Sequence, residues 1–122
     1  MRVIAIDGPA GSGKSTVARA LAARLGMDYL DTGAMYRAVA FAALRRGIDP
    51  DDAELVGRLA DQLELDVADT VTVDGVDATI EIRGPEVTRA VSTVAANPAV
   101  RREINRRQHE WAESRQGGVI EG

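Results

Sequence analysis

The sequence contains no cysteine and only one lysine among its 122 residues. Without cysteine, disulfide bonds and thiolate metal sites are excluded. The N-terminus has no basic segment followed by an apolar stretch, and no apolar run approaches the roughly 18 residues of a membrane span. The formal net charge of −4 argues against a nonspecific nucleic-acid binder, which needs a net basic surface. We therefore expect a soluble, cytoplasmic protein of one domain, with no membrane or nucleic-acid partner.

The single lysine, Lys14, also excludes one class of nucleotide-binding protein. The remaining basic residues are all arginines. Guanine-specific GTPases usually carry an Asn-Lys-x-Asp motif, and these residues offer no second lysine to build one. Lysine has instead been kept at a position where a compact point charge suits a phosphate group.

Lys14 lies in a stretch that fits the phosphate-loop pattern of a glycine, four residues and Gly-Lys-Ser. The stretch consists of Gly8, Pro9, Ala10, Gly11, Ser12, Gly13, Lys14 and Ser15, with Thr16 directly behind it. An apolar run at residues 3–6 precedes it and predicts a fully buried strand. A helical pattern follows, with an apolar face made of Val17, Ala18, Leu21, Ala22 and Leu25.

This strand–loop–helix context predicts a binding site for a nucleoside triphosphate. The glycines allow the backbone N–H groups to surround the phosphates, and the positive end of the following helix points at the same place. Lys14 is the predicted catalytic residue and would contact the β- and γ-phosphates, while the Ser15 hydroxyl would ligate Mg²⁺. The simpler alternative is a glycine-rich turn with a chance lysine.

Further elements follow from caps and periodicity. The first helix should run to about Arg24 and stop at Gly26, before a short strand at residues 27–30. Asp31 or Thr32 should cap a second helix that ends at Gly47. Its predicted apolar face consists of Met35, Val39, Ala42 and Ala43. Asp49-Pro50 should open a third helix, ending near Gln62 and packing through Leu55, Leu59 and Leu63.

A β-hairpin is predicted next, with strands at 70–73 and 76–82 joined by Asp74-Gly75. This loop pairs Val73 with Val76 and Val71 with Ala78 on the buried face. Helices should follow at about 86–95 and, after Asn97-Pro98, to about Ser114. Gly117-Gly118 breaks the last helix, and a core strand begins at Val119.

A second motif, residues 31–37, places a hydroxyl, a phenol and a guanidinium at one helix N-terminus. Ligands of open α/β sheets bind at this end of the strands, and Arg37 could grip a phosphate monoester through two hydrogen bonds. The alternative is a capped surface helix whose Tyr36 packs and whose Arg37 is solvated.

Residues 6–15 together with 30–38 resemble the bacterial cytidylate kinase, or (d)CMP kinase, family of nucleoside monophosphate kinases. Residues 82–87, 91–96 and 98–101 match later segments of that family, so the resemblance covers essentially the whole chain. It implies an α/β fold: a three-layer α/β/α phosphate-loop core with a parallel sheet, incomplete at the C-terminus, plus a hairpin-containing acceptor-binding insertion. Residues 1–64 and 117–122 would form the core, about 65–96 the CMP-binding insertion, and about 97–116 a connecting helix.

The resemblance also implies the reaction and the acceptor site. The enzyme would transfer the γ-phosphoryl group of ATP, with Mg²⁺, to CMP or dCMP, and would be a cytoplasmic monomer. The CMP-binding residues would be Thr32, Tyr36, Arg37, Ser92 and Arg101. Arg37 would bind the CMP phosphate, and Ser92 and Arg101 would lie near the cytosine ring. From composition alone, Ser92 and Arg101 are equally well read as solvated helix residues.

Two alternatives remain open at this point. One is another small-molecule kinase on the same phosphate-loop core, although such an enzyme has no need of the motif at 31–37. The other is a truncated nucleotide-binding fragment without activity. The family continues past Val119-Ile120-Glu121-Gly122 with an Arg-Asp pair, further strands and an arginine-bearing lid. We therefore expect an N-terminal part of a protein of about 200 residues or more.

Overall fold

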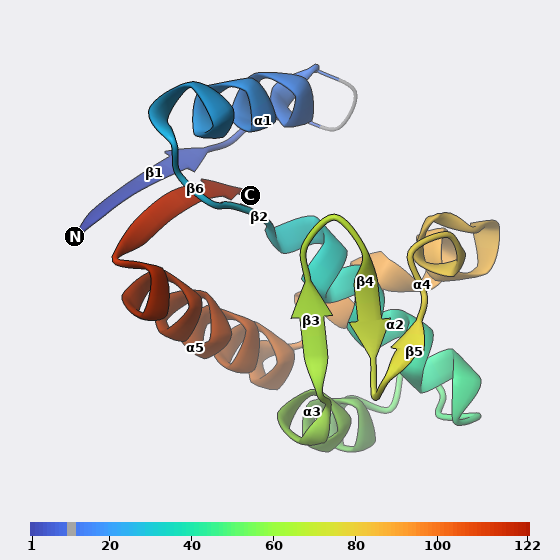
Figure 1. The fold of residues 1–122 in the computed structure, drawn as a ribbon. Coiled ribbons are helices and arrows are strands. Elements are labelled where there is room, and N and C mark those ends of the chain that lie inside the picture. Colours follow the sequence, from blue (N-terminus) through green and yellow to red (C-terminus); the bar gives the residue numbers. More distant parts are fainter. Residues whose placement is uncertain (10–11) are drawn as a thin grey trace. The chain divides into compact units, whose positions relative to one another are not determined.

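The computed structural model describes residues 1–9 and 12–122, which form two compact units (Figure 1). The first unit consists of Met1–Gly33 and Arg107–Gly122, and the second of Ala34–Arg106. The boundaries fall within α2 (Thr32–Arg45) and α5 (Pro98–Arg115), so the chain passes between the units as helix. Within the described ranges, no helix has the length and apolar character needed to cross a bilayer. The expected division into core, insertion and connecting helix is a functional one and stays a prediction.

The first unit is built on a parallel three-stranded sheet. Its strands are β1 (Arg2–Ile6), β2 (Tyr29–Asp31) and β6 (Gly117–Glu121), in the order β1-β6-β2. The last strand in the sequence thus lies between the first two, pairing Ile4 with Val119 and Leu30 with Ile120. The predicted mixed α/β fold with a parallel sheet is confirmed.

Helix α1 (Lys14–Leu25) covers one face of this sheet. Ala18 and Ala22 are buried against Val119, with Ile4, Ile6, Met27 and Tyr29 packed around them. The predicted stop is correct, because Gly26 ends the helix in the left-handed conformation with φ 65°. Val17 and Leu25 were expected on the buried face but are exposed. The helix contacts the sheet mainly through Ala18 and Ala22, so its buried face is narrower than the predicted one.

The opposite face of the sheet contacts the end of α5. A Cβ atom on Gly118 would collide with the indole ring of Trp111, so only glycine allows this close approach. Gly117, with φ 117°, adopts a conformation that favours glycine, and its Cα lies against the backbone of Arg2. The first unit therefore has the predicted three layers: α1, the sheet and the last turns of α5.

The prediction that residues 3–6 are fully buried is wrong. Val3 is 44% exposed, whereas Ile4 and Ile6 are partly covered. Strand β1 pairs with β6 alone among the described residues, and α1 covers only one of its faces. Alternate side chains of β1 therefore face away from α1 and remain uncovered. Among the described residues, the other edge of β1 is not paired with a strand.

The second unit packs helices α2, α3 (Ala53–Gln62), α4 (Pro85–Ala96) and the first turns of α5 beside a small antiparallel sheet. The predicted apolar face of α2 is buried at all four positions. The hairpin strands are β4 (Val71–Val73) and β5 (Val76–Asp77), paired in the predicted register through Val73 and Val76. The Asp74-Gly75 loop has positive φ at both residues, as such a two-residue turn requires.

Three sequence predictions fail in this unit. Asp49-Pro50 opens a turn rather than α3, because the Asp49 carboxylate accepts the N–H of Asp51 and the cap is Asp52. The strand predicted over 76–82 ends at Asp77. The Thr79 N–H donates a hydrogen bond to the Asp77 carboxylate, and the 3₁₀ helix η1 (Glu81–Arg83) follows. Strand β3 (Leu65–Val67) was not predicted. On α3, Leu59 and Leu63 are buried as expected, but Leu55 is exposed and Val56 takes its place.

Candidate functional site

The predicted phosphate loop connects β1 to α1 in the first unit. Gly13 has φ 82° at the N-terminal end of α1, a left-handed conformation that favours glycine, and no side chain in the described ranges caps the helix. The first N–H groups of α1 are therefore open to an anionic ligand. Ser15 and Thr16 lie in the first turn of α1, and the Ser12 N–H donates to the Pro9 carbonyl at 3.3 Å. Ala10 and Gly11 lie outside the described residues.

The Lys14 ammonium lies between the loop and the end of β6. Its Nζ donates to the carbonyl of Gly8 at 2.7 Å and also to the carbonyl of Gly122. Gly122 is held in turn by its N–H, which donates to Ile6 at the end of β1. The only lysine is thus anchored by backbone oxygen atoms beside the N-terminus of α1, where its positive charge is suited to a phosphate.

Glu121, a residue that the sequence analysis did not select, completes this end of the sheet. Glu121 is only 5% exposed, and its Oε2 accepts a hydrogen bond from Ser15 Oγ at 2.7 Å. Its other oxygen, Oε1, accepts from the Tyr29 hydroxyl. The sequence did contain a signal for this residue: Glu121 is acidic and lies at the carboxyl end of a predicted core strand, which is where open α/β sheets bind ligands.

Tyr29 is held in its protonated form by its surroundings. Burial is the largest cause, and together with the Glu121 carboxylate it raises the pKa of the phenol well above its ordinary value. The guanidinium of Arg19 lies 4.8 Å from the centre of the Tyr29 ring and acts in the opposite direction. The phenol therefore remains a hydrogen-bond donor to Glu121 at neutral pH.

The oxygen atoms at this end of the sheet fit a magnesium ion. Ser15 supplies a hydroxyl, a hard ligand of the kind that Mg²⁺ prefers, and the Glu121 carboxylate accepts the hydrogen bond of that hydroxyl. No group of three or more acidic or histidine side chains among the described residues could hold a metal by itself. Mg²⁺ usually keeps several waters and is bound jointly by one or two protein groups and the substrate phosphates, and the Ser15 hydroxyl could serve as such a group.

Four of the five predicted acceptor residues belong to the second unit, and two of them, Tyr36 and Arg101, lie near each other. Burial raises the pKa of Tyr36, while the positive charge of Arg101 acts to lower it, so these side chains lie near each other. Arg37, one residue along α2, donates through Nη1 to the Ile82 carbonyl at 3.2 Å and to Thr88 Oγ1 at 3.0 Å. The segment that follows the hairpin thus orients the guanidinium.

The other two predicted acceptor residues differ in environment. Thr32, at the first position of α2, is buried, and its hydroxyl has no hydrogen-bond partner in the described structure. A buried hydroxyl without a partner is unusual, and a bound water, ion or ligand is one of the groups that could satisfy it. Ser92 lies exposed on α4, and no hydrogen bond in the described ranges joins it to Tyr36, Arg37 or Arg101.

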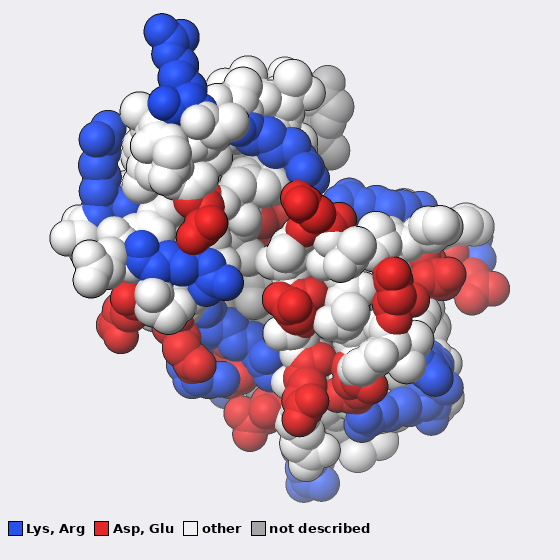
Figure 2. Space-filling view, viewed as in Figure 1, with Lys and Arg blue, Asp and Glu red and all other residues white. Residues whose placement is uncertain are grey.

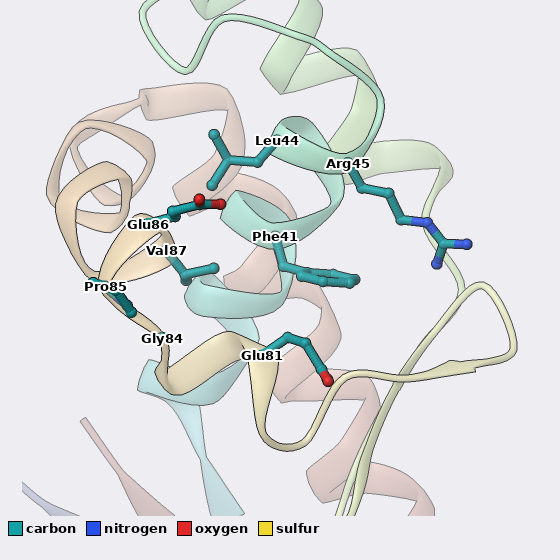
Figure 3. Close-up of a pocket in the computed structure, with 8 residues that line it drawn as sticks. All are labelled: Phe41, Leu44, Arg45, Glu81, Gly84, Pro85, Glu86 and Val87. Atoms are coloured by element: carbon teal, nitrogen blue, oxygen red, sulfur yellow. The ribbon is translucent and has the colours of Figure 1, made fainter.

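A cavity of about 430 Å³ lies beside the elements that orient Arg37 (Figure 3). Phe41, Leu44 and Arg45 line it from α2, and residues 84–87 and Glu81 line it from η1 and the start of α4. None of the predicted site residues lines this cavity. Figure 2 shows acidic and basic side chains interspersed on the viewed face.

Comparison with known proteins identifies relatives over nearly the whole chain. The sequence model of the family described as Cytidylate kinase matches residues 4–122. A cytidylate kinase of Mycolicibacterium paratuberculosis is 50% identical over 98% of this chain, which covers 55% of that protein. The cytidylate kinase of Solibacter usitatus is 48% identical over 98% of this chain and 52% of its own length. A bifunctional pantoate ligase/cytidylate kinase of Synechococcus sp. is 54% identical over 98% of this chain and 23% of that protein. The chain thus spans about half the length of the single-function relatives.

Proposed function

The chain belongs to the cytidylate kinase family, and from this premise we propose that the protein carrying it transfers the γ-phosphoryl group of ATP to CMP or dCMP. The products would be ADP and CDP or dCDP. The observation that carries the proposal is the position of Lys14, held by the Gly8 carbonyl beside the uncapped N-terminus of α1. A cation and open N–H groups at one place are the requirements of a triphosphate site.

The donor side would consist of residues 8–16, with Lys14 as the catalytic residue. Phosphoryl transfer depends on positioning and on stabilising charge over the transferring oxygens, and an ammonium ion can do both. Ser15 would hold Mg²⁺, which bridges phosphate oxygens and offsets their charge. Glu121 would accept a hydrogen bond from the Ser15 hydroxyl. The free electron pairs of the serine oxygen would then be directed toward the cation.

The acceptor side would consist of Thr32, Tyr36, Arg37, Ser92 and Arg101. Arg37 is the residue best suited to the CMP phosphate, because its guanidinium is already oriented by Ile82 and Thr88. The buried, unpartnered hydroxyl of Thr32 supports its assignment to a ligand site. No strong base is needed, because a phosphate monoester oxygen is already anionic at neutral pH. Within this proposal, residues 65–96 form the CMP-binding insertion, and the protein acts as a monomer in the cytoplasm.

The proposal is tested by measuring ADP release from the whole protein with CMP, dCMP, UMP and AMP as acceptors. We expect CMP and dCMP to be preferred and Lys14→Ala to abolish turnover with every acceptor. A clear preference for AMP or UMP would contradict the base assignment. Residual ATP cleavage without any acceptor dependence would contradict phosphoryl transfer to a nucleotide.

A second experiment separates an active kinase from a fragment that only binds nucleotide. Circular dichroism first establishes that the 122-residue chain folds alone. Isothermal titration with ATP and with CMP then reports binding, and the ADP-release assay reports turnover of the same sample. Binding without turnover would identify the chain as a nucleotide-binding part whose activity requires the remainder of the protein.

A further inference from the structure

The Glu121 carboxylate is held from two sides by residues of the first unit. Its Oε2 accepts from Ser15 on α1, and its Oε1 accepts from Tyr29 on β2. Glu121 is only 5% exposed, so water cannot readily replace either donor. Both carboxylate oxygens are therefore committed to named protein groups, and only one of those groups, Ser15, belongs to the predicted phosphate loop.

We propose that Tyr29 is a positioning residue for the metal site: its hydroxyl holds Glu121 in the orientation in which the carboxylate accepts the Ser15 proton. This inference rests on the proposed binding of ATP with Mg²⁺. Tyr29 would contact neither nucleotide nor metal. It acts through Glu121, and Glu121 acts on the one hydroxyl that is placed to ligate the cation.

The hydrogen-bonding capacity of the serine hydroxyl explains why the orientation of Glu121 matters. A serine hydroxyl has one proton to donate and two electron pairs to share. When the proton is directed to Glu121, the electron pairs are free for a cation. When Glu121 rotates away, the hydroxyl can donate elsewhere, and a buried carboxylate oxygen loses its partner, which is costly. One phenol hydroxyl therefore controls the preorganisation of Ser15.

Arg19 links the position of Tyr29 to the same helix that carries Ser15. It follows Ser15 by four residues on α1, so both side chains emerge on the same helix face. Its guanidinium lies over the Tyr29 ring, 4.8 Å from the ring centre. Helix α1 thus contacts Tyr29 through Arg19 and contacts Glu121 through Ser15. The geometry couples β2, β6 and the first turns of α1 at one place.

Tyr29 also packs in the apolar cluster beneath α1, so the test must separate its hydroxyl from its ring. Tyr29→Phe keeps the ring and removes only the donor. The variant, Glu121→Gln and the double variant are compared in the whole protein with Ser114→Ala. Ser114 is a control in the same unit, because its hydroxyl donates to a carbonyl of its own helix, Trp111 O, and accepts from the adjacent Arg115.

The measurement is binding of ATP at increasing Mg²⁺ concentration, by calorimetry, with a parallel titration in excess EDTA. We expect Tyr29→Phe to raise, by about tenfold, the Mg²⁺ concentration that gives half of the full increase in ATP affinity. This is the lower end of the loss in metal affinity that follows when a hydrogen-bond partner of a metal ligand is removed. Binding of metal-free ATP should be unchanged, and Ser114→Ala should match the wild type. Because Tyr29 acts through Glu121, the double variant should be no worse than Glu121→Gln alone.

Three outcomes would decide against the inference. A wild-type Mg²⁺ response in Tyr29→Phe would overturn it, and so would an additive loss in the double variant. An equal loss of ATP binding with and without Mg²⁺ would assign Tyr29 a purely structural role. If the wild-type protein itself showed no Mg²⁺-dependent ATP binding, the proposed function would fail, and this result is distinct from the other three because it precedes any substitution.

Discussion

Gly57 of α3 and Ala99 of α5 lie so close that a Cβ atom on Gly57 would stand 2.8 Å from the Cβ of Ala99. Both belong to the second unit, and Gly57 is buried in the middle of α3. Glycine inside a helix normally costs about 1 kcal/mol relative to alanine. Here the cost is offset by the close approach of two helices, because nothing larger than hydrogen fits at position 57.

The first prediction follows from this contact. Gly57→Ala should lower the free energy of unfolding by about 1–2 kcal/mol, because overpacking of about 1–3 kcal/mol exceeds the gain in helix propensity. Ala99→Gly in the same chain should recover most of the loss by removing the opposing methyl group. Urea unfolding of the two single variants and the double variant measures this. A stabilised Gly57→Ala variant would show that the helices are not in close contact at this point.

The second prediction concerns Asn97, which joins the starts of two helices. Its Nδ2 donates to the Ala53 carbonyl at 2.9 Å, and its Oδ1 accepts from the Ala99 N–H at 3.0 Å. Asn97→Ala should cost about 1–2 kcal/mol of unfolding free energy, since a cap and a buried hydrogen bond are both lost. Asn97→Ser keeps a capping oxygen but cannot reach Ala53, so its cost should be smaller. Equal losses in the two variants would mean that the cap contributes nothing.

The third prediction tests the acceptor site on α2. In the whole protein, Arg37→Gln should weaken CMP binding by about tenfold or more, because a hydrogen bond to a charged group is worth about 1.5–3 kcal/mol. Arg37→Lys should recover only part of the affinity, since an ammonium ion cannot form two parallel bonds to a phosphate. Calorimetric titration with CMP measures both variants.

Arg45→Gln provides the control for this series, because Arg45 is an exposed arginine in the last turn of the same helix. It should bind CMP as the wild type does. If Arg45→Gln and Arg37→Gln weakened binding equally, the effect would come from general charge and not from a phosphate contact. Unchanged binding in Arg37→Gln would remove Arg37 from the acceptor site.

The fourth prediction is a pH dependence that originates in Tyr29. A tyrosine is neutral when protonated, and the pKa of Tyr29 in the folded protein lies above the ordinary value of about 10. As the pH rises past about 10, the unfolded chain loses this proton first, so the stability falls until the pH passes the pKa of the folded state. Below that range Tyr29 contributes no pH dependence.

The measurement compares the wild type with Tyr29→Phe in urea between about pH 8 and about pH 11, on either side of the ordinary tyrosine pKa of about 10. The slope above about pH 10 should be shallower in the variant, and the remaining slope should include Tyr36, whose pKa burial also raises. Identical slopes would contradict the protonated, buried phenol described for Tyr29.

Most elements of the second unit could be predicted because their signals are local. The Asp74-Gly75 turn determines its own hairpin register, since positive φ at two successive residues is favoured only by a few residue types. The cap at Asn97 was predicted for the same reason. Asp49-Pro50 carried an equally good cap signal and failed. Two aspartates within four residues compete to start α3, and a local pattern does not reveal which one has its N–H partner in place.

The candidate site was predicted in part. Lys14 and Ser15 were found because the phosphate-loop pattern is contiguous, and the acceptor residues were found through resemblance to a family. Glu121 and Tyr29 were missed as site residues. Glu121 lies 106 positions after Ser15, and Tyr29 lies 92 positions before Glu121, so no spacing rule connects them.

The sequence by itself determined the phosphate-loop motif, most helices and their caps, and membership of a family, because each depends on contiguous residues and their backbone preferences. Only the tertiary structure decided that β6 lies between β1 and β2 and that Glu121 therefore reaches Ser15 and Tyr29. It also decided that Val3 is exposed while Ile4 is partly covered. Strand order and the covering of a sheet face depend on packing between distant segments, and an apolar run shows only that a residue can be buried, not that another element covers it.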